Sequence, residues 1–219
     1  MISVILPSLG RPSQLLRAIK NLQGSTKVEL EIVVVLNHGD IESHAVMEQF
    51  ENDKRIKVVT MPSHCPKGRS QRCYQAGYEA ASGPWFSFGA DDYVYHQGWA
   101  EAALNCPNKG FVSFHEPHWG SDLACQWMVT KEYIDEVMGG YFGLTYYYKQ
   151  WSDNEVKIRA VNAGRWVYCA EAIIDHLDYA YTKEPMDENA RLSHSFFTQD
   201  SKTYHAREAA GFPVDWPTV

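Results

Sequence analysis

Four apolar runs of strand length alternate with helical segments over the first 96 residues, and this alternation limits the possible folds more than any other feature. The runs cover residues 2–6, 31–36, 56–59 and 85–88, and the helical segments cover residues 12–24, 41–50 and 69–81. Strands joined by helices pair in parallel through right-handed crossovers, and such strands are uniformly apolar because both of their faces are buried. The pattern predicts an α/β fold with a mostly parallel central sheet flanked by helices.

After residue 96 the pattern is less regular and richer in aromatic residues. We expect strands at 111–114, 125–129, 166–168 and 173–174, a helix at 151–163, and a tail from Tyr179 that combines helix with extended segments. No repeat or linker interrupts the chain, and 219 residues fit one domain. We therefore expect a single compact domain over residues 1–219.

Charge and composition exclude several classes of protein. The chain has 20 basic and 27 acidic side chains, a net charge of −7, which disfavours non-specific binding to DNA or to anionic membranes without excluding one basic groove. No apolar run approaches the roughly 18 residues of a membrane span, and the N-terminus is typical of a strand rather than of a signal peptide. The five cysteines contain no CxxC pair and indicate reduced thiols. A cytoplasmic protein is expected.

Polar residues follow the predicted strands, where ligands bind in parallel α/β sheets. Asp91 and Asp92 come directly after the fourth strand and can hold Mg²⁺ or Mn²⁺ against a diphosphate, although paired acids after a strand also form turns and caps. His176 ends another short strand and can supply an imidazole to the same ion, or can be a structural histidine. Arg69 and Arg72, near a helix start, can neutralise phosphate or form a solvated basic face.

The segment WSDNEVKIRA begins the helix predicted at 151–163 and carries two acids. One interpretation makes Asp153 a general base that faces the ligand cleft. The other makes Ser152 or Asp153 a helix cap and pairs Glu155 with Arg159 four residues later. The aromatic residues just before this segment can stack on a sugar or base, or can pack in the core; they are Tyr141, Phe142, Tyr146, Tyr147, Tyr148 and Trp151.

Three blocks, taken in order, resemble the GT-A glycosyltransferases of the inverting family-2 type. They are ISVILPSLGRPSQLLRAIKNL, KGRSQRCYQAGYEAASGPWFSFGADDYV and WSDNEVKIRAVNAGRWVYCAEAIIDH. They are similar to that family's opening strand and turn, its D-x-D region and its acceptor helix with a closing histidine. The resemblance covers roughly residues 1–176. It implies a Rossmann-like GT-A fold with a nucleotide-sugar-binding half (1–96) and an acceptor-binding half with the C-terminal tail (97–219).

The resemblance also implies an activity and a set of roles. The expected reaction is metal-dependent, inverting transfer of a sugar from a nucleotide-diphosphate sugar, with a UDP-sugar favoured, to an acceptor hydroxyl, with Mn²⁺ or Mg²⁺ as cofactor. Asp153 falls on the catalytic base, and Asp91 and His176 fall on metal positions. By the resemblance, Pro7, Ser8, Arg11 and Asp92 fall at the donor and Glu155 at the acceptor. The chemistry of the side chains themselves adds Asn37, Arg69 and Arg72 to the donor contacts and Trp151 to the acceptor contacts.

Two positions depart from the family pattern. Gly89 stands where D-x-D has its first acid, and Asn37 lies where the second strand usually ends in Asp, so the base of the donor stays open. These departures motivate an alternative, a catalytically impaired protein that only binds nucleotides or sugars. A nucleotidyltransferase is disfavoured because PSLGRP lacks its Gly-rich basic loop. The tail resembles those of small phage and environmental enzymes, and glycans, proteins and hydroxymethylated DNA bases are candidate acceptors.

Overall fold

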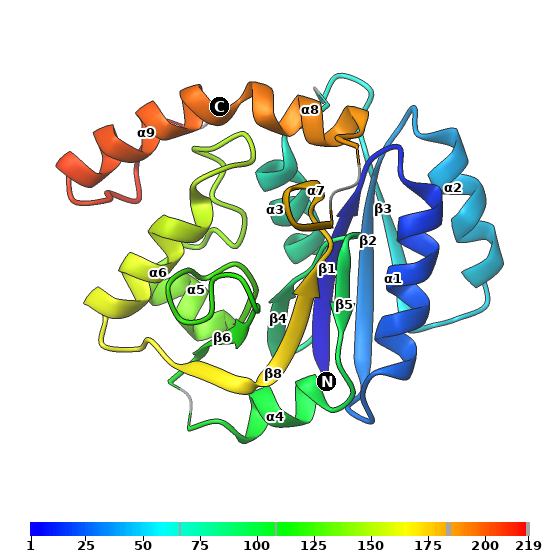
Figure 1. The fold of residues 1–219 in the computed structure, drawn as a ribbon, viewed down its shortest axis with the longest axis horizontal. Helices are drawn as coiled ribbons and strands as arrows, with labels where there is room; N and C mark the ends of the chain where they lie inside the picture. Colours follow the sequence, from blue (N-terminus) through cyan, green and yellow to red (C-terminus); the bar gives the residue numbers. More distant parts are fainter. Residues whose placement is uncertain (66, 108, 183–184, 218–219) are drawn as a thin grey trace.

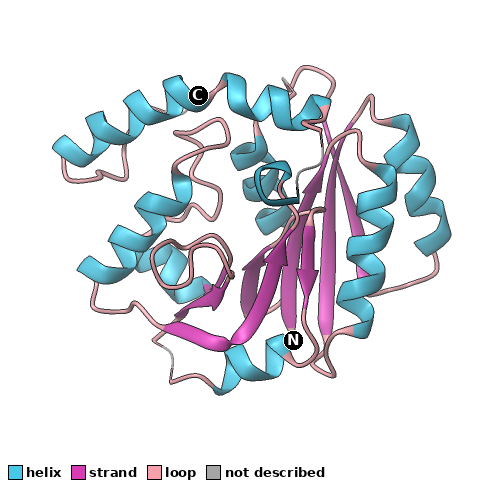
Figure 2. Cartoon of the chain, viewed as in Figure 1, coloured by secondary structure: helices cyan, strands magenta, loops and turns pink. Residues whose placement is uncertain are grey.

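The computed structural model describes residues 1–65, 67–107, 109–182 and 185–217 and forms one α/β body (Figures 1 and 2). Its strands are β1 (Ile2–Ser8), β2 (Leu30–Asn37), β3 (Ile56–Met61), β4 (Trp85–Phe88), β5 (Tyr93–Tyr95), β6 (Phe111–His115), β7 (Trp127–Thr130) and β8 (Tyr168–His176). Its helices are α1 (Pro12–Gly24), α2 (Ile41–Met47), the 3₁₀ helix η1 (Glu48–Phe50), α3 (Ser70–Ala80), α4 (Trp99–Asn105), α5 (Lys131–Val137), α6 (Ser152–Asn162), α7 (Tyr179–Thr182), α8 (Glu188–Ser195) and α9 (Phe197–Ala209).

The strands form a single twisted sheet in the order β3-β2-β1-β4-β7-β6-β8-β5. The first four strands pair in parallel, as predicted, and β6 pairs in parallel with β8. Strands β7 and β5 run antiparallel to their neighbours. The carboxyl ends of β1, β4 and β8 therefore lie at one edge of the sheet, and α8 and α9 run across that edge (Figure 1).

Two apolar layers cover the sheet. On one face, Val4 and Leu6 of β1 pack in a cluster with Leu15, Ile19 and Leu22, the buried face of α1. The same cluster includes Trp99 of α4. On the other face, a cluster rich in aromatic residues joins the sheet to α3, α5 and α6. Alternate residues of β1 thus point to opposite cores, which is why most of the strand is apolar.

The structure contains the elements that the sequence predicted, and it adds a few short ones. The sequence patterns did not indicate β5, α4 or α5, and the two strands predicted at 166–168 and 173–174 are one strand, β8. Its pairing with β6 jumps from Cys169 to Ile173, so a bulge interrupts the apolar pattern. Within the described residues, no helix combines the length and apolar character needed to cross a bilayer.

Glu31 joins several elements at the opposite edge of the sheet. Its carboxylate accepts hydrogen bonds from the hydroxyls of Ser3 (2.5 Å) and Ser82 (2.7 Å) and from the Ser82 backbone N–H, and it pairs with Lys57 Nζ at 2.6 Å. Burial alone would raise the pKa of Glu31, but the hydrogen bonds from Lys57, Ser3 and Ser82 lower it to about 2.

We expect Glu31→Gln to destabilise the protein by about 1.5–3 kcal/mol at pH 7, because charged hydrogen bonds of a buried group are lost. The native pKa is depressed, so the contribution of Glu31 is complete above its ordinary pKa of 4.5 and is lost as the pH falls toward 2. Urea unfolding at pH 7 and pH 3 measures both effects. The exposed neighbour Glu29, changed to Gln, is the control, and equal stabilities of the two variants at pH 7 would contradict this assignment.

Candidate active site

Asp91 and Asp92 lie just beyond β4, at the edge of the sheet where the parallel strands end. The side chain of Asp91 is almost completely buried and accepts a hydrogen bond from Ser8 Oγ at 2.6 Å. Ser8 is the last residue of β1, which pairs with β4, so the sheet register brings the two residues together. Burial and the charge of Asp92 raise the pKa of Asp91 to about 6.

The guanidinium of Arg11 is the counter-cation of these acids. Arg11 Nη1 lies 3.1 Å from Asp91 Oδ1 and 3.0 Å from Asp92 Oδ2. Its Nε and Nη2 donate to the carboxylate of Asp187 at 2.7 and 3.0 Å. Asp187 caps the N-terminus of α8 by accepting from Ala190 N–H. Arg11 therefore connects the loop after β1 to the C-terminal helices that run across the site.

His176 reaches this cluster from β8. The antiparallel pairing of β5 with β8 sets His176 opposite Tyr93, the residue after Asp92. Its Nε2 lies 3.6 Å from Asp92 Oδ1, and its ring packs edge-on against Tyr93. Burial lowers the pKa of His176, but the nearby carboxylate of Asp92 outweighs this and raises it. The acid that His176 contacts in this structure is therefore Asp92.

Three charged residues of the cluster were missed by the sequence analysis. Lys149 is half-buried, and its ammonium is close enough to interact electrostatically with Asp91, Asp92 and Asp187. Arg17 Nη2 donates to the backbone carbonyl of Asp91 at 3.1 Å. Arg17 lies on α1, shortly after Arg11, and this spacing could have indicated a second arginine near the acids. Lys149 and Asp187 belong to no recognisable motif.

Asp153 lies in the first turn of α6. Within the described chain, the hydrogen bonds to its carboxylate from another residue come from Asn154, whose backbone and side-chain N–H groups lie 3.0 and 3.2 Å from Oδ1. Burial raises the pKa of Asp153, and the nearby charge of His176 opposes that rise. The electrostatic contact with His176 links Asp153 to the acids after β4, although the two segments are about 60 residues apart in sequence.

The other residues expected at the donor lie around the same edge. Pro7 is half-buried in β1, and Asn37 ends β2 half-buried, its backbone carbonyl accepting from Asp40 N–H at 3.1 Å. Arg69 precedes α3, and its guanidinium stacks on the ring of Tyr148 at 4.2 Å. Arg69 Nε and Nη1 are buried and have no hydrogen-bond partner among the described residues. Arg72, in the first turn of α3, is half-buried.

Glu155 corrects one of the sequence expectations. It is fully buried, and its carboxylate accepts hydrogen bonds from Tyr147 Oη (2.7 Å), Arg159 Nε (2.8 Å) and Arg207 Nε and Nη2 (2.8 and 2.7 Å). This network ties α6 to α9. An acceptor cannot reach Glu155, so the proposed acceptor contact is replaced by a structural role.

Trp151, the second residue expected at the acceptor, is half-buried against α9. Its ring packs on Phe197, Tyr204 and His205, and its backbone has a φ of 68°, which is uncommon for a bulky residue. The indole Nε1 is buried without a hydrogen-bond partner in the described chain. Of the aromatic residues before it, Phe142, Tyr146 and Tyr147 are buried in the core, which is the packing interpretation.

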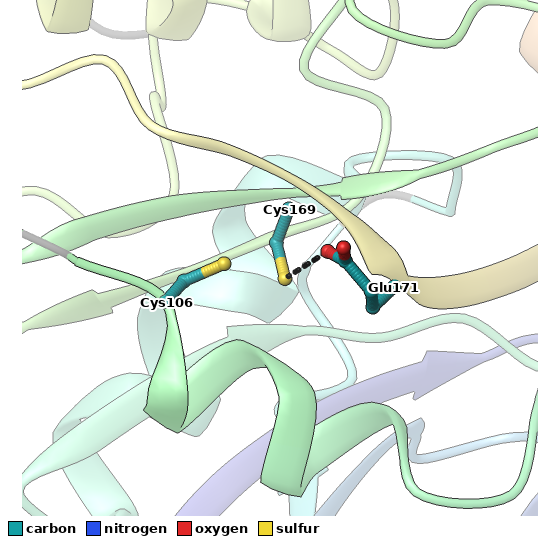
Figure 3. A group of neighbouring side chains, drawn as sticks. All are labelled: Cys106, Cys169 and Glu171. Carbon is teal, nitrogen blue, oxygen red and sulfur yellow. Dashed lines mark hydrogen bonds between the residues drawn. The ribbon is translucent and has the colours of Figure 1, made fainter.

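The ligand atoms of Asp91, Asp92 and His176 are suited to Mn²⁺ or Mg²⁺ by chemistry, since carboxylate oxygen and imidazole nitrogen are their ordinary ligands. The buried carboxylates carry negative charge that Arg11 balances in this structure. A different group, Cys106, Cys169 and Glu171, brings three ligand atoms within 4.8 Å of one another (Figure 3). It lies at the end of α4 and the start of β8, away from the strand ends that carry Asp91 and Asp92 (Figure 1).

Two surface hollows lie away from the acid cluster. One is lined by Lys109, Gly110, Thr130, Glu132 and Arg165, and the other lies between the end of α1 and the start of β2. Neither includes a residue expected at the donor, the metal or the acceptor. The space between the strand ends and α8 holds Arg11 and Lys149, so the protein's own cations fill the region that a ligand would enter.

A family model and a curated protein each match part of this sequence. Residues 3–109 match the model of glycosyl transferase family 2. The chain is 27% identical over 99 residues to protein CgeD of Bacillus subtilis, an alignment that covers 43% of this chain and 23% of that protein.

Solved structures share the fold over most of the chain. The Pyrobaculum calidifontis mannosyltransferase PcManGT, in complex with GDP-Man and Mn²⁺, superposes with a TM-score of 0.68 at 13% identity, covering 100% of this chain and 65% of that one. S. aureus TarS with UDP-GlcNAc gives 0.63 at 14% identity, covering 80% and 57%. Mycobacterium tuberculosis glucosyl-3-phosphoglycerate synthase with Mn²⁺ and UDP-Glc gives 0.62 at 14%, covering 100% and 87%.

The chain is thus shorter than these relatives, spanning about two thirds of the mannosyltransferase and under a quarter of CgeD. The match of the family model covers β1 to α4, the half that carries Asp91 and Asp92, and the structural likeness extends through α9. Residues 3–109 match glycosyl transferase family 2, and the chain as a whole has the GT-A fold.

Proposed function

We propose that the chain is a glycosyltransferase that moves a sugar from a nucleotide-diphosphate sugar to an acceptor hydroxyl with inversion at the anomeric carbon. One observation carries the proposal: His176 meets Asp92 at 3.6 Å at the carboxyl end of β4, and Asp153 at the start of α6 lies within electrostatic reach of the same imidazole. Residues 1–96 would form the donor half and residues 97–219 the acceptor half.

The proton of the acceptor hydroxyl goes to Asp153 in this proposal. As the acceptor oxygen bonds to the anomeric carbon, the bond from that carbon to the diphosphate oxygen breaks, and the carboxylate takes the proton. Burial raises the pKa of Asp153, which makes it a stronger base than an exposed aspartate. A single direct displacement inverts the configuration, because no enzyme nucleophile intervenes.

The negative diphosphate needs compensation. Asp91, Asp92 and His176 would hold Mn²⁺ or Mg²⁺, which supplies Lewis-acid neutralisation of the leaving diphosphate when bound. Arg11 contacts the same acids and has to give up part of that contact for an ion to bind. Arg69 offers two buried N–H groups without a described partner, a fit to phosphate oxygens. Lys149 adds a second cation that faces the acids.

The site residues indicate the nucleotide sugar that serves as donor less directly than they indicate the base and the metal ligands. The solved relatives carry UDP-GlcNAc, UDP-Glc or GDP-Man, so the proposal takes a UDP-sugar first and a GDP-sugar second. Asn37 replaces the usual acid at the end of β2, and its amide can donate to and accept from a base edge. A cytoplasmic location, in a bacterium or in the host of a phage that encodes the chain, completes the proposal.

Release of nucleoside diphosphate from a panel of nucleotide sugars, with and without Mn²⁺, tests the function. We expect metal-dependent release with one donor, and we expect Asp91→Asn to lower it by at least about 100-fold, since a Lewis-acid contact is worth several kcal/mol. The control is Asp135→Asn, an exposed acid on α5. Activity of Asp91→Asn equal to that of the control would remove Asp91 from the metal site.

An impaired protein that binds nucleotides or sugars without turnover is the second candidate, and Gly89 favours it. A Cβ at Gly89 would lie 2.8 Å from Val4 Cγ1, 2.9 Å from the Ile5 carbonyl and 3.2 Å from Tyr95 Oη. The first acid of D-x-D therefore has no room here. If nucleotides bind but no donor is consumed with any divalent ion, this second candidate replaces the first.

A further inference from the structure

Three neighbouring aromatic rings lie at the surface beside His176. They belong to His118, Trp119 and Tyr181, and we call these three residues the aromatic platform. Trp119 is 45% exposed, and the other six tryptophans are buried or half-buried. The His118 side chain is 43% exposed and Tyr181 is half-buried. Large exposed aromatic rings cost free energy in water, so a group of them next to a candidate active site requires an explanation.

Hydrogen bonds hold the platform in one arrangement. Glu116, which is buried, accepts from the backbone N–H groups of His118 and Trp119, both at 3.0 Å, and lies 2.7 Å from His118 Nδ1. The indole N–H of Trp119 donates to Tyr181 Oη at 2.8 Å, and the rings of His118 and Tyr181 stack with centroids 3.6 Å apart. Rings fixed in this way lose little conformational entropy when a ligand binds.

The platform contacts the elements that carry the residues assigned to the metal and to the base. Strand β8 leads from His176 directly into α7, which carries Tyr181 (Figure 1), and the Tyr181 and His176 rings have centroids 6.4 Å apart. On the other side, Lys157 Nζ of α6 donates to the backbone carbonyls of Ser121 and Asp122, at 2.9 and 2.7 Å. This bond attaches the turn that follows Trp119 to the helix that begins with Asp153.

We propose that the aromatic platform is the acceptor subsite and that it binds a neutral pyranose ring of a glycan. The proposal rests on the function proposed above, and it names the substrate class of that same site. The apolar C–H face of a pyranose can cover an aromatic ring, while hydroxyls at the rim find polar partners such as Tyr181 Oη. A sugar on the platform would present a hydroxyl between His176 and Asp153.

The charge around the platform selects against phosphate-bearing acceptors. Glu116 supports the rings, and Asp178 lies close enough to Tyr181 to influence its hydroxyl electrostatically. Asp122 belongs to the same turn as Trp119. Nucleic-acid binding depends on cations that neutralise phosphates, and the described cation nearest this turn, Lys157, is already bonded to backbone carbonyls. A neutral sugar is therefore favoured over a DNA base.

Saturation-transfer NMR with a panel of methyl glycosides (glucose, galactose, mannose and N-acetylglucosamine) tests the platform without the need for turnover. We expect at least one glycoside to bind the wild-type chain in the presence of a nucleoside diphosphate, and Trp119→Ala to weaken that binding about tenfold, the size expected for loss of one aromatic contact. Trp119→Phe should retain most of the affinity. Ile41→Ala, which truncates an exposed apolar residue on α2, is the control.

The outcomes separate the platform from the function. If Trp119→Ala binds glycosides as tightly as Ile41→Ala does, or if the wild-type chain binds none of them, the platform is not the acceptor subsite. Loss of binding to a hydroxymethylated oligonucleotide in Trp119→Ala, with no glycoside bound, would also overturn the sugar assignment. If a donor is found, Trp119→Ala should raise the KM for the acceptor more than it lowers kcat, and Ile41→Ala should change neither. Failure of every donor refutes the proposed function, while the glycoside result still decides the platform.

Discussion

Asp153→Asn is expected to lower the rate of sugar transfer by about 10²- to 10⁴-fold and to leave donor binding unchanged. The amide has nearly the shape of the carboxylate but cannot take a proton, and general-base catalysis is worth this range. The bonds to Asp153 come from Asn154 in the same turn, so the change breaks no contact between elements of the described chain. The protein should therefore fold with a melting temperature close to that of the wild type.

Steady-state kinetics with separate variation of donor and acceptor measure the effect, and calorimetry with the nucleoside diphosphate measures donor binding. Because burial raises the pKa of Asp153, transfer by the wild type should decline as the pH falls through that raised value, and the residual activity of Asp153→Asn should not follow the same curve. Asp135→Asn again serves as the control. Transfer by Asp153→Asn at the wild-type rate would overturn the assignment of the base.

The parallel half of the fold could be predicted because burial on both faces leaves a continuous apolar signal. Strands β1, β2 and β4 carry that signal, and α1 shows its buried face at helical spacing. Strand β3 lies at the edge of the sheet, is partly exposed, and was predicted from a short apolar run alone. Strand β5 was not predicted because it has only three residues. Strand β8 was predicted as two strands because its bulge exposes Ala170 and Glu171. Short or interrupted elements depend on tertiary pairing, which one sequence does not display.

The residues of the candidate site likewise divide into those that the strand pattern predicted and those that it did not. Asp91, Asp92 and His176 end strands, so the strand pattern located them, and the sheet register then placed His176 against Asp92. Lys149, Asp187 and the aromatic platform lie in turns, next to short helices or, for Tyr181, within one, where no periodic pattern predicts position. Glu155 carried an ambiguous signal: its spacing from Arg159 allowed an ion pair, but only the fold reveals Arg207, 52 residues away, as a second partner.

Arg207 makes Glu155 the residue whose replacement should destabilise the chain most. Arg207 is fully buried, donates twice to Glu155, and also donates to the Pro213 carbonyl at 2.9 Å. Arg159 adds a third charged bond to the same carboxylate and reaches the Phe212 carbonyl at 2.7 Å. Removal of the carboxylate would leave two arginines without their counter-charge in the interior.

We expect Glu155→Gln to lower the free energy of unfolding by about 3–5 kcal/mol, the usual cost of removing one partner from a buried ion pair. For a chain of this length, that corresponds to a fall of about 6–20 °C in melting temperature. Asp135→Asn is a matched control, because Lys131 and Asp135 are also an i,i+4 pair but are exposed, and such pairs contribute at most about 0.5 kcal/mol. Urea unfolding of both variants measures the difference. If Glu155→Gln is as stable as the control, the buried network does not hold α6 to α9. The initial expectation that Glu155 contacts the acceptor, which its burial argues against, would then have to be considered again.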